Sequence, residues 1–356
     1  MLNFNRRNFA KLMAAGAGAV TLPASAQSGS NGDLAAPSQR PLIKPARLRE
    51  GDLVGLITPS GHLREEQIGR SMRNLESLGL RYKLGRHVRE IRGNYAGTVA
   101  QRLEDLHAMF ADPEIKAVWA MAGGSGAISL LPFIDYQLIR KNPKVLIGYS
   151  DVTALHLAIH RQTGLVTFHG PIAGSTFTEY TQRHLRAVLM APQPVYTIPM
   201  AEENRARAAE ASQFGVRIAC NGVATGRLIG GNLSLFSALS GTAYAGDYGG
   251  HILFLEDVSE APYRIDRMMT QVNLQLGFDR AAAVMLGIFD KCEAKDGDIS
   301  LTLAETVDDQ ISELKVPAVY GYSFGHIRHQ CTMPMGIMAR LDTAAETLTL
   351  LEAGVI

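Results

Sequence analysis

Ser150 is the residue best placed to act as a nucleophile, because a strand-like apolar run ends just before it and a helix-like pattern begins just after it. The short apolar run Val145–Ile147 predicts a buried parallel strand. From Asp151 the apolar residues recur with helical spacing, and Gly164 stands where a helix would end. A serine on such a strand-to-helix turn exposes its hydroxyl beside a helix N-terminus, which favours developing negative charge. The position suits a nucleophile, and it also suits a serine that only caps the helix.

A serine nucleophile needs a base with a pKa near neutrality, and that base needs a carboxylate to orient it. His326 follows a predicted strand and lies in a loop flanked by glycines, from which side chains reach clefts. His169, at the end of another predicted strand, competes for the same role. Glu256 and Asp257 directly follow the apolar run Ile252–Leu255, where a carboxylate is either a helix cap or a site group.

The elements that would position these residues differ between the two halves of the chain. In the first half, the expected strands lie at 53–57, 82–88, 117–121, 145–147 and 166–169, with helices at 65–78, 99–110, 128–131, 135–140 and 151–163. This alternation predicts a doubly wound parallel sheet. Ligands bind at the carboxyl ends of such strands. The loops at 58–61, 122–126 and 148–151 should therefore meet there.

The second half predicts a smaller α/β domain with a mixed sheet. Its expected strands lie at 251–255, 282–289, 318–322, 337–339 and 347–351, and its helices at 232–239, 265–276 and 301–314. We therefore expect an N-terminal domain at 48–200 and a C-terminal domain at 217–356. Residues 201–216 form a linker or an exposed helix between them, and residues 27–47 form a tether before them.

The 356 residues suffice for two hydrophobic cores, and their charge is balanced. With 35 basic and 34 acidic residues the net charge is +1, which excludes a strongly polycationic nucleic-acid binder. No stretch has eighteen consecutive apolar residues, so we expect no stable membrane insertion.

The first 26 residues have the character of an export signal. Paired arginines at 6 and 7 precede the weakly apolar run Leu12–Leu22, and Ala24-Ser25-Ala26 provides an A-x-A cleavage site. The arrangement is similar to a twin-arginine signal peptide, so we expect the mature protein in the periplasm.

The three cysteines, Cys220, Cys292 and Cys331, are widely spaced and include no C-x-x-C pair. They indicate neither a zinc site nor a dithiol redox centre. We expect them to be small core residues.

Three groups of residues, which occur in this order along the chain, indicate a family more specifically than the spacing of apolar residues does. They are Ile147-Gly-Tyr-Ser-Asp-Val-Thr-Ala-Leu155, Phe254-Leu-Glu-Asp-Val258, and Gly325-His326 with Thr332-Met-Pro-Met-Gly336. Together they resemble the LD-carboxypeptidase family of serine peptidases, which includes muramoyltetrapeptide carboxypeptidases and microcin C self-immunity peptidases. The resemblance extends over roughly residues 48–352, with Ala96-Gly-Thr98 and Gly230-Gly-Asn-Leu233 among its further motifs.

What the resemblance implies is specific. The triad would be Ser150, Glu256 and His326. A flavodoxin-like N-terminal domain and a smaller C-terminal domain would hold the site between them, and the protein would be a homodimer. The substrate would be a murein tetrapeptide, cleaved at the amide bond to its terminal D-alanine, without a metal or a cofactor.

The glycine-rich loop departs from the family pattern. It often reads Arg-Gly-Gly-Tyr-Gly in the family, and here it reads Ala122-Gly-Gly-Ser-Gly126. The glycines needed for close backbone approach remain. By the resemblance, the N–H of Gly124 is the candidate oxyanion donor, with the N–H of Asp151 as the second. The missing arginine and tyrosine put substrate contacts, not the triad, in question.

Recognition of a terminal carboxylate is a natural task for an arginine. Arg264 and Arg267 follow the Glu256 strand and are candidates, although each could equally be a solvated helix residue. Asn232 is a third candidate for substrate binding.

Three alternatives stay open. The same triad could act on a microcin-like peptidyl-nucleotide or another peptide amide. A non-catalytic periplasmic binding protein could share the two-domain plan, although binding alone does not require all three triad residues. An α/β-hydrolase esterase has the same chain order of nucleophile, acid and base, but Val152 stands where G-x-S-x-G has its second glycine.

Overall fold

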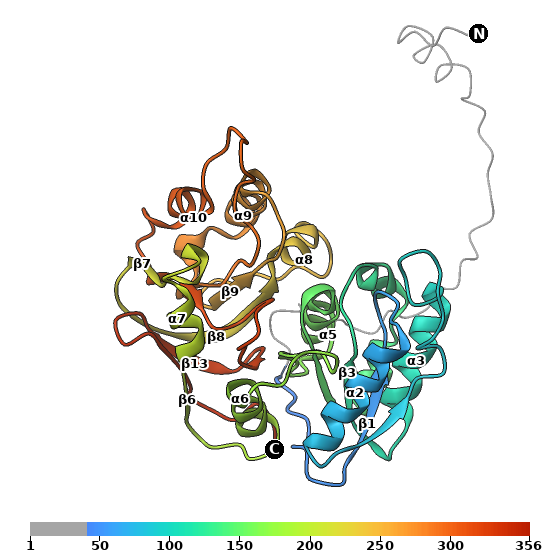
Figure 1. Ribbon diagram of the computed structural model, residues 1–356. Helices are drawn as coiled ribbons and strands as arrows, with labels where there is room; N and C mark the ends of the chain where they lie inside the picture. Colours follow the sequence, from blue (N-terminus) through green and yellow to red (C-terminus); the bar gives the residue numbers. More distant parts are fainter. Residues whose placement is uncertain (1–40) are drawn as a thin grey trace, which may run out of the picture. The chain divides into compact units, whose positions relative to one another are not determined.

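Two β-sheets organise residues 41–356, the part of the chain that the computed structural model describes (Figure 1). All of these residues belong to one compact unit. The predicted export signal and most of the predicted tether lie outside the described residues. Among the helices of residues 41–356, none is long and apolar enough to cross a membrane.

The first sheet has six strands and carries the predicted nucleophile. In spatial order the strands are β12 (Met333–Pro334), β5 (Phe168–His169), β4 (Val145–Gly148), β3 (Ile115–Ala120), β1 (Leu53–Ile57) and β2 (Arg81–Leu84). All neighbours are parallel except β12, which runs antiparallel to β5. The order β2-β1-β3-β4-β5 is that of flavodoxin-like sheets. The predicted doubly wound parallel sheet is confirmed.

The helices of this half follow the predicted alternation. They are α2 (Glu65–Ser77), α3 (Val99–Ala111), the 3₁₀ segment η2 (Ala127–Phe133), α4 (Tyr136–Lys141), the 3₁₀ turn η3 (Ser150–Val152), α5 (Thr153–Thr163) and α6 (Glu179–Leu189). Thr98 begins α3 with a capping box, in which its side chain accepts from the Gln101 N–H and the Gln101 side chain reaches back. Gly164 ends α5 in the left-handed conformation, as predicted.

The second sheet has eight strands and is mixed. In spatial order they are β6 (Tyr196–Pro199), β14 (Thr347–Leu350), β13 (Met338–Asp342), β8 (Val223–Asn232), β9 (Ile252–Glu256), β10 (Ala283–Gly287), β11 (Ala318–Tyr322) and β7 (Arg217–Cys220). The central strands β8 to β11 are parallel, and the outer strands pair antiparallel. The predicted mixed sheet is confirmed, although it has more strands than the first sheet.

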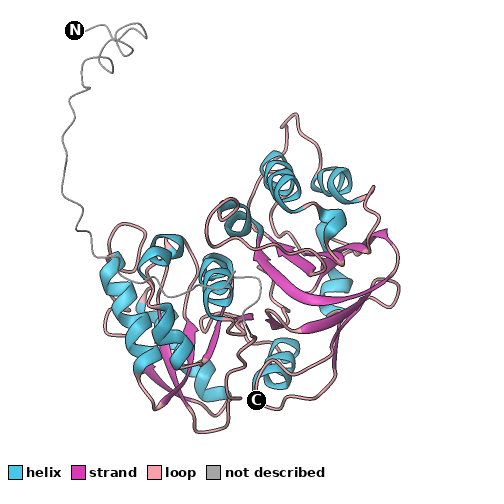
Figure 2. Ribbon diagram, turned by 180° about the vertical axis from the view of Figure 1, so that it is seen from behind, coloured by secondary structure: helices cyan, strands magenta, loops and turns pink. Residues whose placement is uncertain are grey.

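Helices cover the strands of both sheets (Figure 2). The second half contributes α7 (Glu202–Arg207), the 3₁₀ turn η4 (Ser212–Phe214), α8 (Leu233–Ala238), α9 (Pro262–Leu276), the 3₁₀ turn η5 (Phe278–Arg280) and α10 (Leu303–Ile311). Helices α9 and α10 lie side by side (Figure 1). The segment 201–216, predicted as a linker or an exposed helix, contains the short helix α7.

Several strands differ from the sequence prediction. Strands β6, β7, β8 and β12 were not expected, and the expected strand at 82–88 ends at Leu84. Strand β6 precedes residue 200 but pairs with β14 in the second sheet, whereas β12 follows residue 217 but pairs with β5 in the first. Each sheet thus takes one strand from beyond the predicted domain boundary.

Candidate active site

Ser150 lies on a strained turn between β4 and α5. Its φ is +64°, in the left-handed region that residues other than glycine seldom occupy. A backbone held there costs about 1–3 kcal/mol and persists only where its surroundings enforce it. The strand before it is buried throughout, and the 3₁₀ turn η3 leads directly into α5. This is the geometry of a nucleophile elbow, which holds a serine hydroxyl clear of the backbone.

The glycine-rich loop after β3 packs directly against this serine. A Cβ built on Gly123 would lie 2.8 Å from Ser150 Cβ and 2.9 Å from Ser150 Oγ, so only glycine fits there. The Gly123 carbonyl accepts a hydrogen bond from the Gly61 N–H at 3.0 Å. The loops at 58–61, 122–126 and 148–151 therefore meet, as predicted.

Gly124 and Asp151, whose N–H groups are the predicted oxyanion donors, belong to segments that meet at Ser150. Gly124 has a φ of +115°, and its N–H makes no backbone hydrogen bond within residues 41–356. Asp151 is the second residue of η3, where a 3₁₀ turn leaves the N–H without an intrahelical acceptor. The Asp151 carboxylate accepts from the Ala127 N–H at 2.8 Å and so fixes the far end of the loop. The sequence had suggested only the backbone of Asp151, and it had not singled out Gly123.

Glu256 and His326 form a buried pair. Glu256 ends β9 between β8 and β10 and has no exposed surface. Its Oε2 lies 2.6 Å from Nδ1 of His326, whose side chain is 16% exposed. Gly325 has a φ of +110°, and a Cβ there would lie 2.8 Å from Glu256 Oε2, so the loop needs glycine to approach the carboxylate. With Nδ1 held by the carboxylate, Nε2 is the nitrogen left to act as a base.

The pKa of Glu256 is lowered and the pKa of His326 is raised from their ordinary values. Burial by itself would raise the pKa of Glu256, but the charge and hydrogen bond of His326 outweigh it, so this pKa lies below its ordinary value. Burial by itself would lower the pKa of His326, but Glu256 outweighs it, so this pKa lies above its ordinary value. Each partner therefore favours the charged form of the other.

Tyr149 links this pair to the nucleophile turn. It directly precedes Ser150, and its ring lies edge-on to the ring of His326 with 4.7 Å between centroids. None of the hydrogen bonds within residues 41–356 joins Ser150 Oγ to His326. The structure thus brings the three predicted triad residues to one place, with only the Glu256–His326 hydrogen bond already formed.

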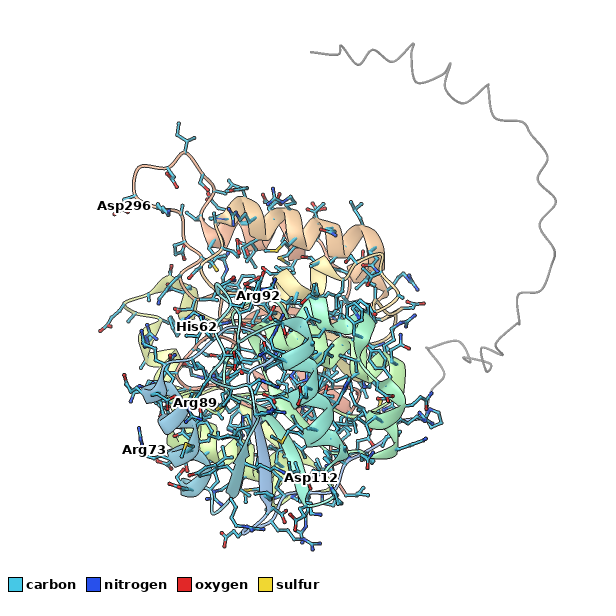
Figure 3. The ribbon with its side chains drawn as sticks, turned by 90° about the vertical axis from the view of Figure 1, so that its right-hand side faces the viewer. His62, Arg73, Arg89, Arg92, Asp112 and Asp296 are labelled. Atoms are coloured by element: carbon cyan, nitrogen blue, oxygen red, sulfur yellow. The ribbon has the colours of Figure 1, made fainter. Side chains whose placement is uncertain are left out.

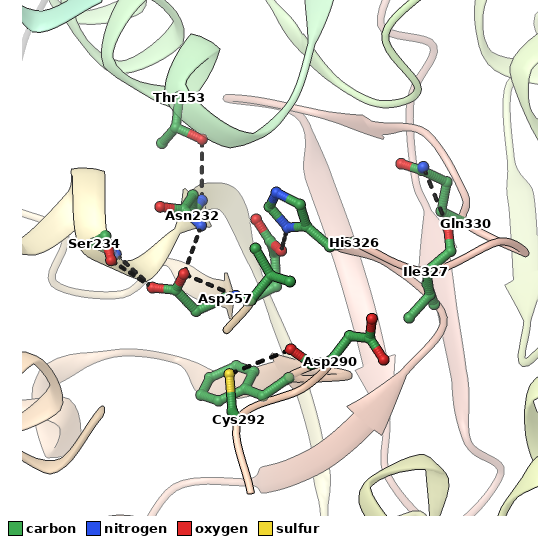
Figure 4. A network of polar contacts seen from close by, with 12 residues as sticks. Thr153, Asn232, Ser234, Asp257, Asp290, Cys292, His326, Ile327 and Gln330 are labelled. Carbon is green, nitrogen blue, oxygen red and sulfur yellow. Dashed lines mark hydrogen bonds and ion pairs between the residues drawn. The ribbon is translucent and has the colours of Figure 1, made fainter. Parts of the chain in front are cut away.

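A second carboxylate, that of Asp257, lies in a hydrogen-bond network next to Glu256 (Figure 4). It accepts hydrogen bonds from Asn232 Nδ2, from the N–H and hydroxyl of Ser234, and from the Val258 N–H. Burial, and then the charge of Glu256, raises the pKa of Asp257 to about 6. Asp257 is therefore a structural acceptor in this arrangement.

Asn232 joins this network to the nucleophile helix. Its backbone N–H donates to Thr153 Oγ1 in α5 at 3.0 Å (Figure 4). Its side-chain oxygen accepts from the Leu235 N–H and so caps α8. Since the Asn232 amide already bonds Asp257 and the helix end, its role in substrate binding stays a prediction.

Arg264 and Arg267 lie on α9. Arg264 donates to Glu260 Oε2 at 3.2 Å and to the Tyr263 hydroxyl at 3.1 Å, and Arg267 lies over the Tyr263 ring at 5.6 Å. Arg264 also lines a cavity of about 800 Å³, whose wall includes the loop that carries Asp296 and does not include Ser150 or His326. That loop projects from the body of the described chain (Figure 3). Carboxylate recognition by either arginine stays a prediction.

His169, the competing base, is fully buried, and neither ring nitrogen has a hydrogen-bond partner among residues 41–356. Burial lowers its pKa to about 4. The Glu256 carboxylate pairs with His326 instead, which favours His326 as the base.

The three cysteines form no disulfide: Cys292 and Cys331 are buried, whereas Cys220 is half-buried. In the described part of the chain, no group of three or more His, Cys, Asp or Glu side chains could hold a metal ion.

A serine at an elbow of a doubly wound sheet, with a buried glutamate–histidine pair beside it, defines a serine-type hydrolase. The chain matches the LD-carboxypeptidase N-terminal domain over residues 54–170 and the LD-carboxypeptidase C-terminal domain over residues 225–341. It therefore belongs to the LD-carboxypeptidase family, peptidase S66, and is a serine-type carboxypeptidase.

Curated relatives and solved structures agree with this assignment. A probable murein peptide carboxypeptidase of Bacillus subtilis is 38% identical over 312 residues, covering 88% of this chain and 95% of the relative. A murein tetrapeptide carboxypeptidase of Pseudomonas aeruginosa is 35% identical over 297 residues, covering 81% of this chain and 92% of the relative. The solved structure of MccF in complex with glutamyl sulfamoyl guanosine superposes with a TM-score of 0.80 at 25% identity, covering 89% of this chain and 100% of the MccF chain.

Proposed function

We propose that this enzyme hydrolyses the amide bond to the terminal D-alanine of murein tetrapeptide, with Ser150, His326 and Glu256 as its catalytic triad. The observation that carries the proposal is the 2.6 Å Glu256–His326 pair, packed through Tyr149 against the strained turn of Ser150. The names of the Bacillus and Pseudomonas relatives support the murein substrate.

The proposed reaction follows from the roles of these groups. Ser150 Oγ attacks the carbonyl carbon of the scissile amide while His326 Nε2 takes the hydroxyl proton. Glu256 stabilises the resulting imidazolium through Nδ1. The tetrahedral intermediate collapses as His326 protonates the amine of the leaving D-alanine. Water, deprotonated by His326, then attacks the acyl-enzyme and releases the shortened peptide and free Ser150.

The oxyanion is proposed to lie between the N–H groups of Gly124 and Asp151. Removal of one such donor costs about 3–4 kcal/mol of transition-state stabilisation in other serine hydrolases. Both N–H groups belong to segments that meet at Ser150, and the absence of a side chain on Gly123 leaves room for the reacting carbonyl.

A second substrate class is favoured by the similarity to MccF, which has been solved with glutamyl sulfamoyl guanosine. The same triad would then cleave an amide that joins an acidic amino acid to a nucleotide. The loop reading Ala122-Gly-Gly-Ser-Gly126 lacks the large side chains that the family often has there, which fits a substrate range of its own.

We also propose that the protein is exported by the twin-arginine route to the periplasm and acts as a homodimer. Cell fractionation with Arg6→Lys and Arg7→Lys together tests the route, because a twin-arginine signal requires both arginines. The mass in solution, measured by light scattering, tests the dimer.

The deciding experiment incubates the purified enzyme with murein tetrapeptide and, separately, with a glutamyl-nucleotide amide, and follows both products by mass spectrometry. D-Alanine release by the wild type and none by Ser150→Ala supports the proposal. Cleavage of the nucleotide substrate alone would replace the murein assignment, and equal release by both proteins would exclude Ser150 as the nucleophile.

A further inference from the structure

Arg102, on α3, is a buried arginine whose hydrogen bonds do not go to a carboxylate. Its side chain donates to the Pro59 carbonyl at 2.8 Å and, over a longer distance of 3.4 Å, to the Ser129 hydroxyl. The residue is 3% exposed, and its Nε has no partner among residues 41–356. A buried charge that no opposite charge pairs with destabilises a fold, and such groups concentrate at functional sites.

The first of these contacts leads to the beginning of the glycine-rich loop. Pro59 belongs to the loop 58–61, and two residues later the Gly61 N–H donates to the Gly123 carbonyl at 3.0 Å. A Cβ on Gly124 would lie 3.1 Å from the Cα of Gly61, so the two backbones are in close contact. Arg102 therefore ties the segment on which Gly123 and Gly124 rest to helix α3.

The second contact leads to the end of the same loop. The Ser129 hydroxyl donates to the Gly126 carbonyl at 2.7 Å, and a Cβ on Gly126 would lie 2.8 Å from Arg102 Nη1. The guanidinium thus packs directly against Gly126. The next N–H along the chain, that of Ala127, donates to the carboxylate of Asp151, the residue after Ser150.

Tyr95 covers the guanidinium from another side. The Arg102 guanidinium lies over the Tyr95 ring at 5.2 Å from its centroid, an arrangement in which the ring face attracts the cation. A Cβ on Gly126 would also lie 2.8 Å from two atoms of this ring. Tyr95 itself forms a backbone bridge with Gly61. The ring, the loop 58–61 and the end of the glycine-rich loop therefore enclose one guanidinium.

We propose that Arg102 is a positioning residue for the oxyanion site: it joins the two anchors of the glycine-rich loop and thereby fixes the direction of the Gly124 N–H. The two anchors are the loop 58–61 and Gly126. The inference rests on the proposed nucleophile and oxyanion donors but not on the proposed substrate. Since an oxyanion donor acts on the transition state, loss of Arg102 should slow the chemical step and leave ligand binding nearly unchanged.

The test uses a fluorophosphonate probe, whose phosphoryl oxygen takes the place of the oxyanion. Ser150 Oγ bonds to phosphorus, fluoride leaves, and the serine proton passes to His326. Labelling at increasing probe concentration separates the maximal rate from the half-saturating concentration. In Arg102→Met, which keeps the length of the side chain without its donors, the maximal rate should fall by about tenfold to a hundredfold. The half-saturating concentration should change by less than about threefold.

Chemical rescue distinguishes this role from a general loss of stability. Arg102→Ala leaves a space that a free guanidinium ion can enter. Guanidinium chloride, at concentrations too low to unfold the protein, should raise the maximal rate of this variant by about fivefold or more, and sodium chloride at the same concentration should not. A residue that only stabilised the fold would lower the melting temperature and leave the rate of the folded protein unchanged.

Arg140 provides the matched control, because its guanidinium also donates to a backbone carbonyl, that of Thr163 at the far end of α5 from Ser150. Arg140→Met should keep the wild-type maximal rate, and Arg140→Ala should not respond to guanidinium. Thermal melting shows which variants are folded. If the larger changes at Arg102 prevent folding, Arg102→Lys is measured instead. It keeps the charge but cannot reach both anchors, so its maximal rate should fall by about threefold or more.

The proposal is overturned if the folded Arg102 variants keep the wild-type maximal rate, if only the half-saturating concentration changes, or if guanidinium restores nothing to Arg102→Ala. Absence of labelling in the wild type would instead overturn the proposed nucleophile, and with it this inference. Labelling that depends on Arg102 in a protein that releases no D-alanine would overturn the proposed substrate alone.

Discussion

Replacement of Glu256 by glutamine isolates the charge that acts on His326. Glutamine has nearly the same shape, so the packing around the end of β9 changes little. Its side-chain oxygen can still accept from His326 Nδ1, but it carries no charge. What the variant loses is the attraction between the carboxylate and the imidazolium that forms when His326 takes the Ser150 proton.

The size of this loss follows from the geometry. The carboxylate is fully buried and Oε2 lies 2.6 Å from Nδ1. Two opposite charges about 4 Å apart, at an effective dielectric constant of about 20, attract by about 4 kcal/mol. The imidazolium is charged in the transition state and neutral in the resting enzyme, so most of this energy appears in the barrier. A barrier higher by about 4 kcal/mol slows the reaction by about a thousandfold.

The assay compares kcat/KM for D-alanine release, and the fluorophosphonate labelling rate, between Glu256→Gln and the wild type. Glu260→Gln is the control, because it removes a carboxylate only four residues away that pairs with Arg264 instead of with a histidine. We expect a loss of about a thousandfold in the first variant and less than about threefold in the labelling of the second. If Glu256→Gln kept more than a tenth of wild-type activity, the role of Glu256 as the orienting acid would be wrong.

Three further predictions test other parts of the site and fold. Gly123→Ala should abolish probe labelling while leaving the protein folded, because its Cβ would overlap Ser150 Oγ; labelling at the wild-type rate would contradict the packing described here. The pH profile of kcat/KM should fall on the acid side with a midpoint above about 6.5, because protonated His326 cannot act as a base and its pKa is raised; a midpoint well below 6 would exclude it. Thr98→Ala should lower the free energy of unfolding by about 1 kcal/mol in urea titrations, since it removes the side-chain N-cap of α3; an unchanged free energy of unfolding would contradict this.

Local patterns predicted the elements that make the nucleophile turn. The apolar run before Gly148 and the helical spacing after Asp151 predicted β4 and α5, and Gly164 ends that helix as expected. The spacing did not decide whether Ser150 is a cap or a nucleophile. Its left-handed φ is a backbone property that no local preference for serine predicts.

The missed strands share a physical cause. Strand β8 contains Gly226, Gly230 and Gly231, a composition that favours loops. These glycines are present because other chain segments approach closely: a Cβ on Gly230 would clash with the Phe254 carbonyl, and one on Gly231 would lie 2.7 Å from Thr153. Strand β12 has two residues and exists only through its pairing with β5. Such long-range contacts leave no periodic pattern in the sequence.

Long-range pairings of the same kind bring the proposed triad residues together. The loop of His326 leaves β11 in the second sheet and enters β12 in the first, so it is anchored at both ends in different sheets. On the other side of the site, Asn232 at the end of β8 bonds Thr153 at the start of α5, three residues after Ser150. The separation between the proposed nucleophile and the proposed base therefore depends on two connections between the sheets: the strand that follows the His326 loop, and the hydrogen bond from the Asn232 N–H to the Thr153 hydroxyl. Because both lie within ten residues of a triad member, disturbing either connection should change the Ser150–His326 geometry before it unfolds the protein.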